Sequence, residues 1–159
     1  MTDSNLLLAL AFGIGVIAGL RALTAPAVVA WAAHLHWINL LGTHLAFMGT
    51  IAAVAIFTLA AVGEIVNDKL PKTPPRTATP SLIIRIVMGA FAAATLSAGI
   101  GGSLWIGALL GGVGAVVGTF GGYYVRTGIV KALHSPDFVI ALVEDAVAVC
   151  GGLFLASRL

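Results

Sequence analysis

The chain has 159 residues, of which 60% are hydrophobic and only 9% are charged, and its mean hydropathy is +1.09. A soluble domain carries about 25% charged residues, so this composition excludes a soluble globular protein. The net charge of +2 gives no indication of a nucleic-acid partner. We therefore expect one integral membrane domain over residues 1–159, with the lipid bilayer as its surroundings.

The first apolar segment, residues 6–33, is predicted to form one long helix. It exceeds the roughly 20 residues that a crossing requires, so a tilt or a bend is expected. Pro26 removes one backbone hydrogen bond and clashes one turn back, and this favours a bend. Arg21 lies deep inside the segment. The sequence leaves open whether this segment crosses the membrane or re-enters it.

The connection that follows, residues 34–47, contains no Lys or Arg. Three tryptophans fit an aromatic belt at one membrane interface: Trp31, Trp37 and Trp105. Three histidines also lie in the connection: His34, His36 and His44. They include a His-x-His pair, but no acidic or thiol ligand accompanies it, so the pattern favours interfacial histidines over a metal site.

Four more apolar segments complete a predicted all-α transmembrane helix bundle of about five spans. They are residues 46–68, 81–98, 104–131 and 136–157. The turn 70–80 holds four prolines and cannot be helical. Glycines at 107, 111, 114, 118 and 121 form a stripe along one face of segment 104–131, so another helix can approach it backbone to backbone. A small bundle with such faces predicts a homo-oligomer.

The basic residues indicate an orientation. Five of them fall in or beside two turns: Lys69, Lys72, Arg76, Arg126 and Lys131. The positive-inside rule places both turns in the cytoplasm. With five crossings, the N-terminus is then predicted on the same cytoplasmic side.

Seven charged residues fall within or at the ends of the predicted spans: Arg21, Glu64, Asp68, Arg85, Arg126, Glu144 and Asp145. A charge at the centre of a span costs about 2.5–3.5 kcal/mol, so such residues must pair or face water. We expect Arg21 to contact Glu144 or Asp145 near the membrane midplane. These two acids point about 100° apart on a helix and can serve different partners.

These charges favour two functions, between which the sequence does not decide. One is a small transporter or channel-like protein whose cytoplasm-facing polar cavity carries a small cation or polar solute, with proton coupling. Carboxylates suit hard cations, and burial favours the protonated form of a carboxylate. The alternative is a structural membrane protein whose buried ion pairs only hold the helices together. An enzyme is disfavoured, because no nucleophile elbow or metal-ligand triad is visible, and no cofactor is expected.

Three stretches carry a resemblance to a known family. They are GLRALTAPAVVAW (19–31), GEIVNDKLPKTPPRT (63–77) and RIVMGA (85–90). The chain resembles small bacterial membrane proteins known as domain of unknown function 4126. The resemblance implies a compact helical protein of the bacterial inner membrane, and it implies no activity.

Overall fold

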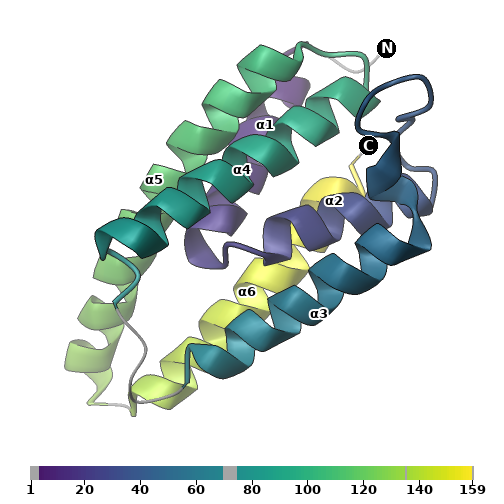
Figure 1. The fold of residues 1–159 in the computed structure, drawn as a ribbon. Helices are drawn as coiled ribbons and strands as arrows, with labels where there is room; N and C mark the ends of the chain where they lie inside the picture. Colours follow the sequence, from purple (N-terminus) through teal and green to yellow (C-terminus); the bar gives the residue numbers. More distant parts are fainter. Residues whose placement is uncertain (1–3, 70–74, 135, 159) are drawn as a thin grey trace.

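The computed structural model describes residues 4–69, 75–134 and 136–158, and in this part of the chain all regular structure is helical, as predicted. The elements are α1 (Ser4–Leu20), α2 (Thr24–His34), the 3-10 helix η1 (Ala46–Gly49), α3 (Ile51–Asn67), α4 (Thr79–Gly99), α5 (Leu104–Leu133) and α6 (Asp137–Ala156) (Figure 1). Local residues explain several helix starts. Thr50 and Ser103 cap α3 and α5 with their hydroxyl oxygens, and α4 carries proline in its first turn.

The helices have the lengths and surfaces of a membrane protein. Among the described helices, α4, α5 and α6 are long and apolar enough to cross a bilayer, while α1 and α3 are apolar but shorter. Large apolar side chains cover the outer faces; Ile51, Leu59 and Leu109 are 74%, 72% and 68% exposed. Such a surface requires a lipid environment.

The first predicted helix is two helices, and this corrects the expected single bent segment. Residues 21–23 separate α1 from α2. Pro26 sits in the first turn of α2, where its missing N–H and fixed φ are tolerated, and it prevents the helical bond back to Ala22. The chain therefore breaks one turn before the proline instead of bending at it.

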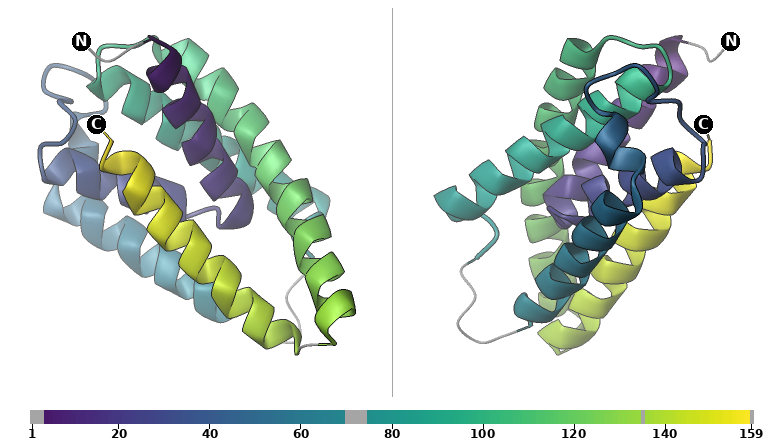
Figure 2. Two further views of the ribbon diagram at one scale, coloured as in Figure 1. Left: turned by 180° about the vertical axis from the view of Figure 1, so that it is seen from behind. Right: turned by 45° about the vertical axis from the view of Figure 1, so that its right-hand side comes forward.

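After the break the chain reverses, so α1 and α2 form a pair of helices whose far ends lie at the same end of the bundle (Figure 1). Gly15 and Gly19 of α1 pack on successive turns of α5, so α1 and α5 run in the same direction. Val28 of α2 then packs against Gly152 of α6, and Ala33 lies beside Gly49. Figure 2 shows α2 running back toward the end from which α1 started.

This reversal also determines the end of the bundle at which α1 starts. Leu7 of α1 lies close to Gly102 in the turn between α4 and α5, and Asn39 donates its backbone N–H to Gly99 O at 2.9 Å. The start of α1 and the connection 34–49 therefore lie at one end of the bundle, and the C-terminal ends of α3 and α5 lie at the other (Figure 1). The five-crossing count put the N-terminus beside the basic turns because it assumed one full passage for residues 6–33.

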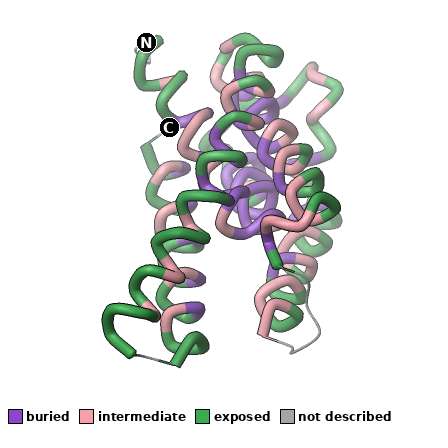
Figure 3. Tube along the Cα trace, turned by 90° about the vertical axis from the view of Figure 1, so that its left-hand side faces the viewer, coloured by how far each residue is buried: buried purple, intermediate pink, exposed green. Residues whose placement is uncertain are grey.

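The helices pack in two groups of three. Contacts are densest within α1, α4 and α5; α2 packs on α3 and α6 and also on α4, and α1 also contacts α6. Figure 3 shows the buried residues concentrated where the two groups meet, with the exposed residues on the outside. The break at residues 21–23 thus separates α1, in the first group, from α2, in the second.

The predicted glycine stripe packs α5 against both α1 and α4. A Cβ on Gly111 would overlap the backbone of Gly89 in α4, and one on Gly118 would overlap the backbone of Val16 in α1. Gly121 differs, because a Cβ there would meet nothing within 4 Å. Four glycines of the stripe therefore serve helix packing inside the molecule, and the fifth faces outward.

We expect Gly118→Ala to lower the free energy of unfolding by about 2 kcal/mol, because the added methyl group overpacks a backbone contact. Gly121→Ala is the matched control on the same helix. It should stabilise the protein by up to about 1 kcal/mol, since alanine has the higher helix propensity. Unfolding in mixed micelles measures both. Equal effects of the two substitutions would contradict the packing of α5 described here.

Candidate functional site

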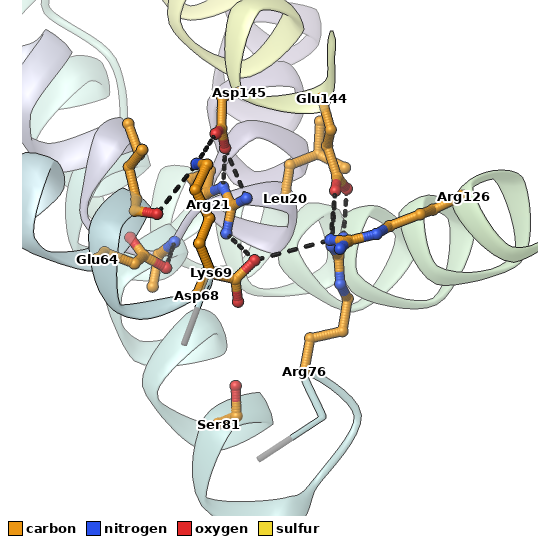
Figure 4. Close-up of polar contacts among 12 residues, drawn as sticks. Leu20, Arg21, Glu64, Asp68, Lys69, Arg76, Ser81, Arg126, Glu144 and Asp145 are labelled. Atoms are coloured by element: carbon orange, nitrogen blue, oxygen red, sulfur yellow. Dashed lines mark hydrogen bonds and ion pairs between the residues drawn. The ribbon is translucent and has the colours of Figure 1, made fainter. Parts of the chain in front are cut away.

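Charged side chains from the break, from α3 to α6 and from the turn between α3 and α4 meet in one region, drawn in part in Figure 4. We call this set the charge cluster: Arg21, Glu64, Asp68, Lys69, Arg76, Arg85, Arg126, Asp137, Glu144 and Asp145. All seven residues predicted from the sequence belong to it. It also contains every carboxylate side chain of the described residues, and its acidic and basic groups are equal in number.

Arg21 is the centre of the charge cluster and is fully buried, with 0% exposure. Its Nη1 lies 2.6 Å from Asp68 Oδ2. Its Nε and Nη2 lie 2.6 and 2.5 Å from Asp145 Oδ1. Lys69 Nζ binds the second oxygen of Asp145 at 2.6 Å. The predicted contact between Arg21 and Asp145 is therefore confirmed. Asp68 binds the same guanidinium group.

The backbone groups freed by the break are held by charged side chains from two other helices. Glu64 accepts the N–H groups of Ala22 and Leu23, each at 2.8 Å. Arg85 Nη1 donates to the carbonyl oxygens of Gly19 and Leu20, each at 2.8 Å. Helix ends carry unpaired donors at the N-terminus and unpaired acceptors at the C-terminus. Glu64 therefore caps the start of α2, and Arg85 caps the end of α1.

Glu144 organises the other side of the charge cluster. Arg76 donates to both of its carboxylate oxygens, and Arg126 Nη1 lies 3.4 Å from Oε2. Arg126 also binds Asp137 at the start of α6, with Nη2 2.6 Å from Oδ2. The neighbouring acid Asp145 faces Arg21 instead, so the two adjacent acids serve different partners, as expected from their helical angle.

Asp68 follows the last turn of α3 and stays ionised at neutral pH. Burial alone would raise the pKa of Asp68, but the hydrogen bond and charge of Arg21 outweigh it and hold that pKa below its usual range. The stabilisation from this pair is thus present at neutral pH and is lost as the pH falls through the lowered pKa.

Three members of the charge cluster were not predicted as site residues. Lys69 and Arg76 were read only as orientation signals in the basic turn, yet Arg76 is just 8% exposed and reaches Glu144 on α6. Asp137 lies at the start of the predicted segment 136–157. A residue's position in a turn does not reveal whether its side chain folds back into the bundle. The excess of carboxylates over arginines in the predicted spans was the one available signal.

The structure also bears on the metal and cavity hypotheses. Among the residues described, no group of three His, Cys, Asp or Glu is placed to hold a metal ion, and His34 Nδ1 lies 3.0 Å from Gly49 O. A groove of about 300 Å³ between α5 and α6 reaches the charge cluster at Arg126 and Glu144. Its other lining residues are apolar or glycine.

The fold and the charge cluster define a class of protein: an apolar helical bundle in which a break between two helices is held by charged side chains. Residues 8–157 match a family described as Domain of unknown function (DUF4126), so nearly the whole chain belongs to this family. No curated protein and no solved structure matches the chain.

Proposed function

We propose that the protein is a small, non-enzymatic membrane transporter or channel-like protein, and that the charge cluster closes its pathway in this structure. The break between α1 and α2 is the observation that supports this proposal. Interrupted backbone at membrane depth is tolerated only where protein or a water-filled cavity surrounds it. Discontinuous helices are the usual means by which transporters bring helix ends to their substrates.

The proposed cargo is a small cation. Four of the chain's six acidic residues were predicted at the spans, and the structure brings them together. Carboxylate oxygens suit hard cations. In this arrangement basic groups or backbone N–H groups occupy each of the four, so a cation would have to replace arginine or lysine partners as it enters. Exchange of ion-pair partners is therefore the proposed step that opens the site.

The structural role remains the second candidate, and one observation favours it. The ion pairs of Arg21, Arg76 and Arg85 each join different helices or connections, so the charge cluster ties both three-helix groups together without any cargo. Buried ion pairs are nevertheless weak evidence for stability, because the desolvation penalty offsets the attraction. The homo-oligomer is proposed on the outer face of α5, where Gly121 leaves room for another helix.

Cation flux into liposomes separates these two functions. Purified protein should carry a monovalent or divalent cation above the rate of empty liposomes, and Glu64→Gln and Asp68→Asn should each reduce that rate at least about tenfold. Lys131→Gln is the control, since this exposed residue of α5 lies outside the charge cluster. Wild-type flux equal to that of empty liposomes, for alkali, alkaline-earth and manganese ions alike, would sink the transport proposal.

We further propose that the charge cluster lies toward the cytoplasm of a bacterial inner membrane, which places the start of α1 outside. Single cysteines at His44 and Lys131, in a Cys150→Ser background, test this orientation. An impermeant thiol reagent should label position 44 in intact cells and position 131 only after permeabilisation. The reverse pattern would show that the basic turns face outward.

A further inference from the structure

Arg85 differs from the other arginines of the charge cluster in the atoms that it binds. The others bind carboxylates: Arg21, Arg76 and Arg126. Arg85 instead donates to two backbone carbonyl oxygens, Gly19 O and Leu20 O, each at 2.8 Å. Its Nε donates to Ser81 Oγ at 3.3 Å, and its Nη2 lies 3.7 Å from Glu64 Oε1. Oxygen atoms, most of them uncharged, thus surround a cationic group that is only 4% exposed.

Contacts that do not involve Arg85 hold these oxygens in place. Gly19 packs directly against the backbone of α5, and Thr119 on α5 donates its hydroxyl to Gly19 O at 3.3 Å. Glu64 is fixed by the two backbone N–H groups at the start of α2. The end of α1 and the Glu64 carboxylate therefore keep their positions when the Arg85 side chain is elsewhere.

We propose that these oxygens form the binding site of a monovalent alkali cation, which enters when the Arg85 side chain moves away. This inference rests on the proposed transport function and names the site and the class of cargo. Carbonyl, hydroxyl and carboxylate oxygens are the ligands of hard cations. The carbonyl end of an interrupted helix carries partial negative charge, and such ends coordinate sodium in transporters. In this structure the guanidinium group of Arg85 takes the place of the ion.

The balance of charge favours a singly charged ion. Glu64 is the one carboxylate among the oxygens described around Arg85, and the acidic and basic groups of the whole charge cluster are equal in number. A monovalent ion in place of the guanidinium group keeps this balance. A divalent ion would leave one buried positive charge uncompensated, which is costly.

The Arg85 side chain has a short way out of the site. It lies back along α4, because its Nε reaches Ser81 one turn earlier. Ser81 is half-buried, and α4 begins at Thr79, within about two turns of Arg85. A long arginine side chain can extend toward the end of its helix and keep its charge near the interface. The carbonyl oxygens of α1 then become available to the cation.

Removal of the Arg85 side chain tests the site separately from transport. In mixed micelles, sodium or potassium chloride should raise the unfolding temperature of Arg85→Ala saturably, above the value in N-methylglucamine chloride at equal ionic strength. Millimolar guanidinium chloride, which supplies the missing group, should also raise it. The wild-type protein should require at least about tenfold more alkali cation, because Arg85 occupies the site in most molecules. Arg85→Gln keeps one donor for the carbonyl oxygens and gives the same comparison if Arg85→Ala does not fold.

A second substitution removes one ligand of the site without breaking an ion pair. In the Arg85→Ala background, Ser81→Ala should raise the half-saturating concentration of the alkali cation about fivefold. Ser97→Ala is the matched control, since Ser97 lies on the same helix and packs against Gly107, away from the site. Equal effects of the two serine substitutions would overturn the proposed site.

The site and the transport function fail in different ways. Cation flux through the wild-type protein, with equal responses of Arg85→Ala to alkali ions and N-methylglucamine, would overturn this site and leave transport standing. A response that is specific to alkali ions and depends on Ser81, without flux in liposomes, would support the site and contradict transport.

Discussion

Arg21→Leu should lower the free energy of unfolding by about 3–5 kcal/mol, because removing one partner of a buried ion pair leaves the other charge uncompensated. The substitution removes a partner from two carboxylates, Asp68 and Asp145, and it affects them unequally. Asp145 keeps Lys69 at 2.6 Å, whereas Asp68, among the described residues, keeps Arg126 at the longer distance of 3.7 Å. Unfolding in mixed micelles measures the loss, and Arg158→Gln at the opposite end of the bundle is the control.

A second substitution should then restore part of this stability. Neutralising Asp68 in the Arg21→Leu background should recover about 1–2 kcal/mol, as expected for residues in one network. Asp145→Asn should recover less, and Glu144→Gln nothing, because Glu144 does not contact Arg21. If no acid substitution restores stability, Arg21 serves a bound anion or a water-filled space instead of these carboxylates.

Glu64→Ala should open the break between α1 and α2. The carboxylate accepts two backbone N–H groups, and hydrogen bonds to charged groups contribute about 1.5–3 kcal/mol each. Amide exchange at Ala22 and Leu23 should therefore accelerate at least about tenfold, as measured by hydrogen–deuterium exchange of the peptide that covers them. Glu64→Gln should have a smaller effect, since its amide oxygen still accepts one of the two bonds.

Glu144→Gln provides the comparison for this experiment. It removes a charge from the same cluster without touching the break, so exchange at residues 22 and 23 should stay unchanged. Faster exchange in both variants would mean that the charge cluster loosens as a whole, and that Glu64 has no specific role as the cap of α2.

Much of this architecture could be predicted from the sequence because it depends on local composition. The apolar segments and the glycine stripe each depend on residues close together in the chain. A contact of Arg21 with Glu144 or Asp145 was also predictable, because a charge deep in an apolar segment has few alternatives; which of the two acids it contacts was not.

The break could not be predicted, because the residues that stabilise it are distant in the chain. The residue before α2 is Leu23, which has no capping side chain; its cap comes from Glu64, 41 positions away. The pattern of apolar residues also does not indicate whether the chain continues or turns back, since in a membrane protein lipid-facing and core-facing residues are both apolar. A helix that crosses and a pair that enters and returns therefore have similar sequences.

The order of the helices gives the molecule a mechanical asymmetry. The break at residues 21–23 joins the two three-helix groups, and the end of α3, the start of α4, the end of α5 and the start of α6 lie on the same side of the molecule, that of the charge cluster (Figure 1). The connections at the opposite end, 35–50 and 100–103, each stay within one group. Rotation of the groups about the charged side would therefore separate the opposite side first, breaking the hydrogen bond from Asn39 to Gly99 while every covalent connection stays intact.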